Sequence, residues 1–121
     1  MFVTGALLAM FAVVLGAFGA HALKKYFEGT NYAQTWETGV RYHMYHALGL
    51  LFIGMMQMPS LFGPSQTFQT AAILMLIGMI LFSGSLYALA ISRIKILGAI
   101  TPLGGLCLIA AWICVAIGIA A

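Results

Sequence analysis

Apolar residues run in four long blocks along the chain, and short polar stretches separate these blocks. The blocks cover residues 2–23, 40–58, 68–91 and 96–121. A helix needs about 20 mostly apolar residues to cross the hydrocarbon core of a bilayer. Each block is close to that length. The pattern therefore predicts a single domain of the all-α class, an integral membrane four-helix bundle spanning residues 1–121.

The first connection, residues 24–39, is polar and aromatic. Aromatic or apolar side chains recur every fourth position at Tyr32, Trp36 and Val40, with polar residues between them. That period is typical of an amphipathic helix. We therefore expect a short amphipathic interfacial helix between the first two spans. Four aromatic residues of this connection are of the kind that gather at headgroup level: Tyr26, Phe27, Tyr32 and Trp36.

The composition agrees with a membrane protein. Hydrophobic residues make up 64% of the chain and charged residues only 6%, whereas soluble domains carry about a quarter charged residues. So few charges could not cover a globular surface in water, so we expect the lipid bilayer to surround the spans. The formal net charge of +3 comes from basic residues at the span ends. They form no basic patch, so no nucleic-acid partner is expected.

The basic residues predict the orientation. Lys24, Lys25 and Arg41 flank the first connection, and Arg93 and Lys95 lie in the third. The second connection and both termini carry no Lys or Arg. By the positive-inside rule, the first and third connections are cytoplasmic and both termini are outside. The first span is longer than a signal-peptide core and no basic residue precedes it. We expect it to be retained in a multi-pass protein of the cytoplasmic (inner) membrane.

This orientation brings polar side chains of all four spans to a similar depth, in what we call the polar layer. Its members are His21 of the first span, Arg41, Tyr42, His43 and His46 of the second, Ser83, Ser85 and Tyr87 of the third, and Thr101 of the fourth. Lipid offers such groups no partners, so they usually face the interior. Two interpretations remain open: a polar cavity that binds a ligand, or interhelical hydrogen bonds that specify packing, worth about 0.6 kcal/mol each.

The polar layer contains residue types that could support catalysis or metal binding. His21, His43 and His46 could bind a metal, and two of them could ligate a haem iron. No carboxylate or cysteine lies in the layer, so we expect no metal and no cofactor. Ser83 or Ser85 with His46 could act as nucleophile and base, but no acid is placed to orient the histidine. We therefore expect no catalytic residue and no enzyme activity.

Glycine residues occur on every span, where small side chains let membrane helices approach closely. We expect five of them to serve helix packing: Gly16, Gly19, Gly49, Gly84 and Gly104.

Four segments carry a resemblance to a known family. They are GAFGAHAL, WETGVRYHMYHALGLL, LFSGSLYAL and ILGAITPLGGLCLIAAW, in this order. The chain resembles domain of unknown function family 423, small bacterial inner-membrane proteins that include relatives of the eukaryotic transmembrane protein 256. The resemblance implies four membrane helices and no established reaction. The family's motif positions correspond here to Gly16, Gly19, His21, Trp36, Arg41, Tyr42, His46, Gly49, Ser83, Gly84, Tyr87, Thr101, Pro102 and Gly104.

The sequence favours a structural or accessory role, either in membrane homeostasis or as a subunit of a larger membrane assembly. The alternative is a binding or transport module that uses the polar layer for a lipid headgroup or a small polar solute. A homo-oligomer, or accessory contact with a larger membrane complex, is the expected kind of protein partnership.

Overall fold

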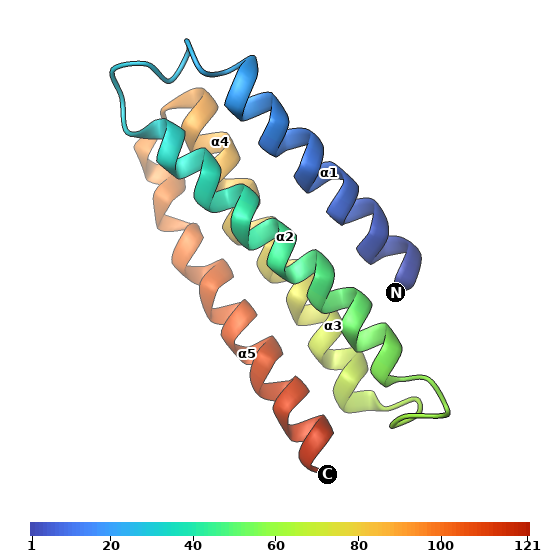
Figure 1. Cartoon of the computed structure of the whole chain (residues 1–121). Helices are drawn as coiled ribbons and strands as arrows, with labels where there is room; N and C mark the ends of the chain where they lie inside the picture. The colour runs from blue at the N-terminus through green and yellow to red at the C-terminus, as the bar shows by residue number, and fades with distance from the viewer.

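The computed structural model describes all 121 residues, and the chain is helical with no strand (Figure 1). The elements are α1 (Phe2–His21), α2 (Tyr32–Met56), α3 (Gln66–Met79), the π-helical segment η1 (Ile80–Gly84), α4 (Ser85–Ser92), the 3-10 helix η2 (Lys95–Ala99) and α5 (Thr101–Ala120). α3, η1 and α4 follow one another without a break and form one rod. The chain therefore forms four helical rods, which confirms the all-α prediction.

Three rods are long and apolar enough to cross a membrane: Phe2–His21, Gln66–Ser92 and Lys95–Ala120. α2 is not among them, because its first half carries much of the polar layer. It nevertheless runs antiparallel to α1 along that helix's whole length. Trp36 packs at Gly19 near one end of the pair, and Phe2 packs at Gly54 near the other. α2 therefore extends through the same depth as α1.

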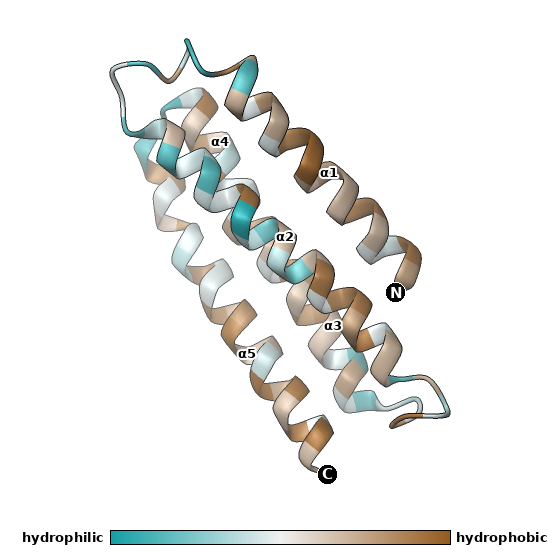
Figure 2. Ribbon diagram, in the orientation of Figure 1, coloured by the Kyte–Doolittle hydropathy of each residue, from teal (hydrophilic) through white to brown (hydrophobic).

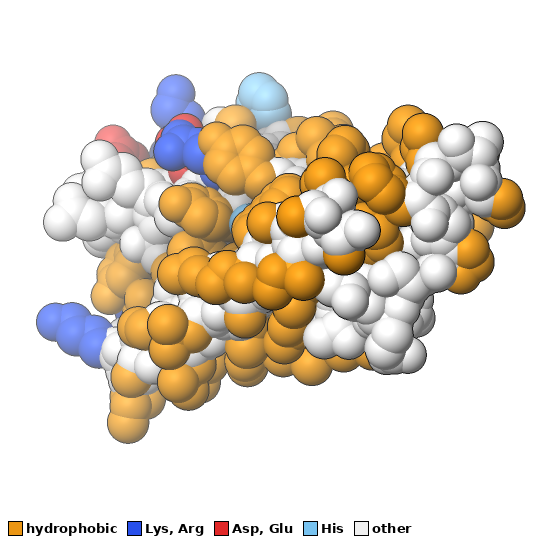
Figure 3. Space-filling view, turned by 90° about the horizontal axis from the view of Figure 1, so that it is seen from below, with side chains coloured by type: hydrophobic (Ala, Val, Ile, Leu, Met, Phe, Trp, Pro, Cys, Tyr) orange, Lys and Arg blue, Asp and Glu red, His pale blue; other side chains and the backbone are white.

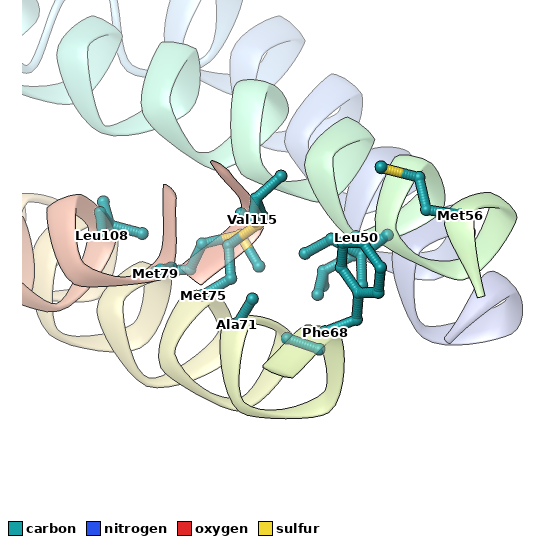
Figure 4. Close-up of a cluster of buried hydrophobic side chains, with 11 residues drawn as sticks. Leu50, Met56, Phe68, Ala71, Met75, Met79, Leu108 and Val115 are labelled. Carbon is teal, nitrogen blue, oxygen red and sulfur yellow. The ribbon is translucent and has the colours of Figure 1, made fainter. Parts of the chain in front are cut away.

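α2 and the α3–η1–α4 rod occupy the middle of the structure, with α1 and α5 on the outside (Figure 1). α1 packs almost only on α2. α5 packs mainly on α3 and η1 of the α3–η1–α4 rod. Eleven buried apolar side chains of α2, α3 and α5 form the main core, among them Leu50, Phe68 and Met75 (Figure 4). His43 and His46 of α2 are also buried by neighbouring rods and need not meet lipid, so α2 can be the most polar rod.

Missing side chains allow the closest contacts between rods. A Cβ on Gly104 of α5 would lie only 2.8 Å from the Cα of Phe82. A Cβ on Gly49 would lie 2.9 Å from the Met75 sulfur, and one on Gly16 would lie 3.2 Å from Val40. These three positions lie where neighbouring helices touch.

Gly84 is different from the other predicted packing glycines. A Cβ there would meet no atom within 4 Å, so its predicted role in close packing is wrong. Gly84 is the last residue of η1, and its Cβ position faces no neighbouring helix. The close approach occurs instead at Gly39, which was not among the predicted packing glycines: a Cβ there would lie 2.9 Å from the Tyr87 ring.

The first connection also differs from the prediction. The residues of the expected interfacial helix are helical, but they are the opening turns of α2 and not a separate element. Trp36 and Phe27 are only 6% and 3% exposed and pack around Ala90 of α4. These two members of the predicted belt are therefore buried, and Gly19 leaves room for the Trp36 indole against α1, whereas Tyr26 is 45% exposed.

The two basic connections lie at the same end of the molecule. Arg93 follows α4 in a left-handed conformation, with φ of 60°. Its guanidinium donates a hydrogen bond to the Tyr26 carbonyl and lies 4.6 Å from the centre of the Tyr26 ring. Hydrophilic residues gather at this end of the ribbon (Figure 2). The space-filling view shows the charged side chains towards one side of a largely hydrophobic surface (Figure 3).

Candidate functional site

The polar layer divides into an interior group and an exposed group. The interior members are buried or half-buried and connect different helices: His43, His46, Ser83, Ser85, Tyr87 and Thr101. His21, Arg41 and Tyr42 are exposed. The nine residues therefore do not form one continuous site.

His46 connects α2 to α5 through its ring nitrogens. The Trp112 indole donates to Nε2 of His46 at 3.0 Å, and Nδ1 lies 2.7 Å from the Tyr42 carbonyl one turn earlier. An indole N–H can only donate, so Nε2 must accept. Nδ1 then carries the proton and donates to the carbonyl. Both ring nitrogens of this buried, neutral imidazole are satisfied.

Ser83 and Tyr87 connect the α3–η1–α4 rod to α2. The Ser83 hydroxyl donates to the Gly39 carbonyl at 2.7 Å. Tyr87, one turn later, packs its ring at Gly39 and hydrogen-bonds through its hydroxyl to Nδ1 of His43 at 2.9 Å. The same Tyr87 ring lies 4.8 Å from the Trp36 ring, centre to centre. The absence of a side chain at Gly39 thus makes room for the Tyr87 ring and lets Ser83 reach the Gly39 carbonyl.

Ser85 connects the same rod to α5. Its hydroxyl lies 2.6 Å from the Thr101 hydroxyl and also donates to the Phe82 carbonyl at 2.9 Å. Ser83 and Ser85 are two residues apart, so they point to opposite sides of the rod and contact different helices.

His43 is the only interior member with an unpaired atom. Its Nε2 is buried and has no hydrogen-bond partner within 3.5 Å, and the Leu8 backbone of α1 is close enough for only a weak interaction. If Tyr87 donates to Nδ1, then Nε2 carries an unpaired N–H. In the other tautomer, Nε2 has an unpaired acceptor. Either way one polar atom is unsatisfied, which is unusual in a folded protein.

The exposed members make few contacts with the rest of the layer. His21 ends α1 and is exposed, so the expectation that it faces the interior is wrong. It lies beyond the part of α1 that packs on α2. Arg41 forms a surface ion pair with Glu37 at 2.8 Å, a type of contact worth less than about 1 kcal/mol. Tyr42 contributes its carbonyl to the His46 network, and its ring packs on Phe82.

The histidines do not gather around a common point. No group of three or more His, Cys, Asp or Glu side chains is arranged to hold a metal ion. His46 uses both nitrogens within the protein, and His21 lies at the end of α1.

Two cavities lie beside the predicted residues. An open groove of about 610 Å³ runs between α2 and α5 beside His46, and its lining is mainly aromatic and apolar, including Tyr45 and Trp112. A larger cavity of about 840 Å³ lies between the end of α1 and the start of α2, with His21 at its edge. Neither cavity is lined by His43, Ser83 or Tyr87.

Two tryptophans take part in the interhelical contacts but were not among the predicted site residues. Trp36 donates from its indole to the Leu15 carbonyl of α1 at 2.8 Å, and Trp112 donates to His46. A signal existed in the sequence, since a buried indole N–H usually finds a partner. The sequence does not reveal which acceptor each indole reaches.

Comparison with known proteins identifies relatives along nearly the whole chain. Residues 15–105 match the family model described as a protein of unknown function, DUF423. The chain is 50% identical over 115 residues to the UPF0382 membrane protein YwdK of Bacillus subtilis, covering 95% of this chain and 91% of that one. It is 46% identical over 111 residues to a UPF0382 membrane protein of Staphylococcus haemolyticus, covering 92% and 87%. No solved structure matches the chain.

These relatives are named as membrane proteins, and the structure has several helices suited to crossing a bilayer. The matched range, residues 15–105, contains the interior group of the polar layer. This chain is therefore a multi-pass membrane protein that belongs to the DUF423 family.

Proposed function

We propose that this protein has a structural or accessory role in the cytoplasmic (inner) membrane. It would act in membrane homeostasis or as a small subunit of a larger membrane assembly, as a homo-oligomer or through contact with that assembly. Its outer rods, α1 and α5, offer exposed apolar side chains such as Phe11 and Ile109 to lipid or to neighbouring helices.

The closed hydrogen bonding of the interior group carries this proposal. His46, Ser83, Ser85, Tyr87 and Thr101 all bond to another polar group of the chain. These bonds connect α2 to α4, α2 to α5 and α4 to α5. Groups already paired with one another are poorly available to a ligand, and they specify which helix faces meet. The arrangement favours a packing network over a binding cavity.

The same pairing argues against catalysis. A serine nucleophile needs a base within hydrogen-bonding reach. Ser83 bonds to the Gly39 carbonyl, Ser85 bonds to Thr101, and His46 bonds to Trp112 and the Tyr42 carbonyl. Neither serine is bonded to a histidine. We therefore propose that the protein is not an enzyme.

The proposed topology has four crossings, with both termini outside. α2 would be the additional crossing, since it runs alongside α1, and the basic first and third connections would be cytoplasmic by the positive-inside rule. In a variant with Cys107 and Cys114 replaced by alanine, a cysteine at Ser60 should react with an impermeant thiol reagent in intact cells. A cysteine at Lys95 should react only after the membrane is opened. The reverse pattern would contradict this orientation.

The packing network predicts coupling between His46 and Trp112. His46→Leu leaves the indole N–H without its acceptor, so we expect a loss of about 1 kcal/mol in unfolding free energy. In a protein that already carries Trp112→Phe, adding His46→Leu should lower the unfolding free energy much less, because no indole N–H is left unpaired. A double-mutant cycle in detergent measures this coupling. His46→Gln, which can keep an acceptor, should restore both stability and function in a deletion strain. A stable His46→Gln protein that fails to function would contradict the structural role.

The second candidate function, binding or transport through the polar layer, rests on the unpaired Nε2 of His43. If the role is structural, His43→Leu should lose the Tyr87 bond but also remove an unsatisfied atom. The two effects are each about 1 kcal/mol and opposite in sign, so stability should change little. Function in a deletion strain should be retained. A His43→Leu protein that is stable but inactive would favour the second candidate.

A further inference from the structure

The larger cavity lies at the basic end of the molecule, and we call it the end pocket. It has a volume of about 840 Å³ and is formed by the end of α1, the first connection and the first turns of α2. Its apolar part includes Gly16, Gly19, Trp36 and Val40. Its polar part includes His21, Lys24, Lys25, Glu28 and Glu37. The pocket therefore combines an apolar wall with several charged side chains.

The lysines of the end pocket have no anionic partner within the protein. The chain forms one ion pair, between Arg41 and Glu37. Lys24 and Lys25 are exposed and have no carboxylate within ion-pair distance, and Glu28 is likewise unpaired. Glu37 is paired with Arg41, so the unpaired charges of the end pocket are those of Lys24, Lys25 and Glu28. The excess positive charge at one pocket suits a phosphate group.

The apolar wall indicates where that phosphate comes from. Gly16 and Gly19 belong to α1, whose exposed side chains are apolar, for example Val13 and Phe18. The pocket lies where this apolar helix ends and the polar connection begins, which is the depth of lipid headgroups if α1 crosses the bilayer. A soluble phosphate compound would not need an apolar wall. A phospholipid would use both parts.

We propose that the end pocket binds a glycerophospholipid, with the phosphodiester between Lys24 and Lys25 and the glycerol region against the apolar wall. This goes beyond the structural role proposed above. Of the polar layer only His21 borders the pocket, and none of the interior hydrogen bonds is involved. The protein would thereby hold one lipid in a defined position beside α1 and α2.

Native mass spectrometry of the full-length protein in detergent, titrated with phosphatidylglycerol, tests the proposal. The double variant Lys24→Gln, Lys25→Gln should bind the lipid about thirtyfold more weakly, since one lysine beside anionic lipid contributes a factor of about five. Lys95→Gln, at the same end but outside the pocket, should leave binding unchanged. Ala20→Trp, which keeps every charge and places an indole among the lining residues of the pocket, should also weaken binding. Thermal unfolding without added lipid should be the same for all variants.

Three results would overturn the proposal. If Lys95→Gln weakens binding as much as the double variant, the attraction comes from the general positive charge of this end. If Ala20→Trp still binds lipid normally, the lipid lies elsewhere. If glycerol 3-phosphate displaces the lipid at similar concentration, the pocket recognises a soluble phosphate compound. The structural role proposed above would be unaffected by these outcomes, because its test depends on His46 and Trp112.

Discussion

Replacing Gly104 with alanine is expected to destabilise the protein strongly, by about 3 kcal/mol, at the upper end of the range for overpacking a tight contact. The new Cβ would lie 2.8 Å from both the Phe82 Cα and the Leu81 carbonyl carbon. These are backbone atoms of the neighbouring rod, which cannot rotate away as a side chain could. α5 would have to move outward, which would also separate Thr101 from Ser85. Unfolding in detergent, followed by circular dichroism, measures the loss.

The adjacent residue supplies the control for Gly104. A Cβ on Gly105 would lie 3.8 Å from the Phe82 ring, an ordinary contact distance. Gly105→Ala should therefore be neutral or stabilising by up to about 1 kcal/mol, the helix-propensity difference between the two residues. If Gly104→Ala and Gly105→Ala changed stability equally, α5 would not approach the α3–η1–α4 rod closely at Gly104.

Removing the Trp36 side chain is expected to have the second large effect. Trp36→Ala should cost about 3 kcal/mol, at the lower end of the range for truncating a buried tryptophan. The indole fills the space above Gly19, packs on Phe27 and Tyr87, and donates to the Leu15 carbonyl. It is therefore the main attachment of α1 at the basic end. Unfolding in detergent should show the loss.

Two further variants separate packing from hydrogen bonding at this position. Trp36→Phe keeps an aromatic ring but loses the N–H, so it should cost only about 1 kcal/mol. Phe11→Ala removes an exposed aromatic side chain of α1 and should change stability by less than about 0.5 kcal/mol. A Trp36→Ala protein as stable as the Phe11→Ala protein would contradict the central role of Trp36 in holding α1.

The exposed apolar surface of α1 explains why this attachment matters. Most of its large side chains face outward, and only Gly5 and Ala12 are buried. In lipid the hydrophobic effect does not hold such a helix to its neighbour, so close packing and specific hydrogen bonds must do so. The small residues of α1 that face α2 allow the close packing, and the Trp36 indole supplies the hydrogen bond.

The pattern of apolar and polar residues determined the helical class, the approximate helix positions and the presence of membrane-crossing segments. These features depend on local composition over about 20 residues, which the sequence contains in full. The ion pair between Glu37 and Arg41 is of the same local kind, because residues four apart on a helix are neighbours whatever the tertiary structure.

The tertiary structure alone decided how the polar side chains divide. At similar predicted depth, His46 bonds to Trp112 while His21 is exposed. Depth along a helix follows from residue number, but the direction of a side chain relative to other helices depends on how the rods pack. Ser83 and Ser85 illustrate this, since they lie on opposite sides of one rod, and only the packing of the rods decides that Ser83 meets α2 and Ser85 meets α5.

The glycines illustrate the same division. Composition predicts that small residues will lie at helix contacts, and Gly104 does so. Which glycines touch a partner depends on the crossing points of the rods, and these placed Gly39 in a contact and left Gly84 out of one. The sequence by itself thus determined which segments are helical and suited to lipid. Tertiary packing decided which polar groups are paired, because hydrogen bonds between helices require a specific distance and direction that no local pattern encodes.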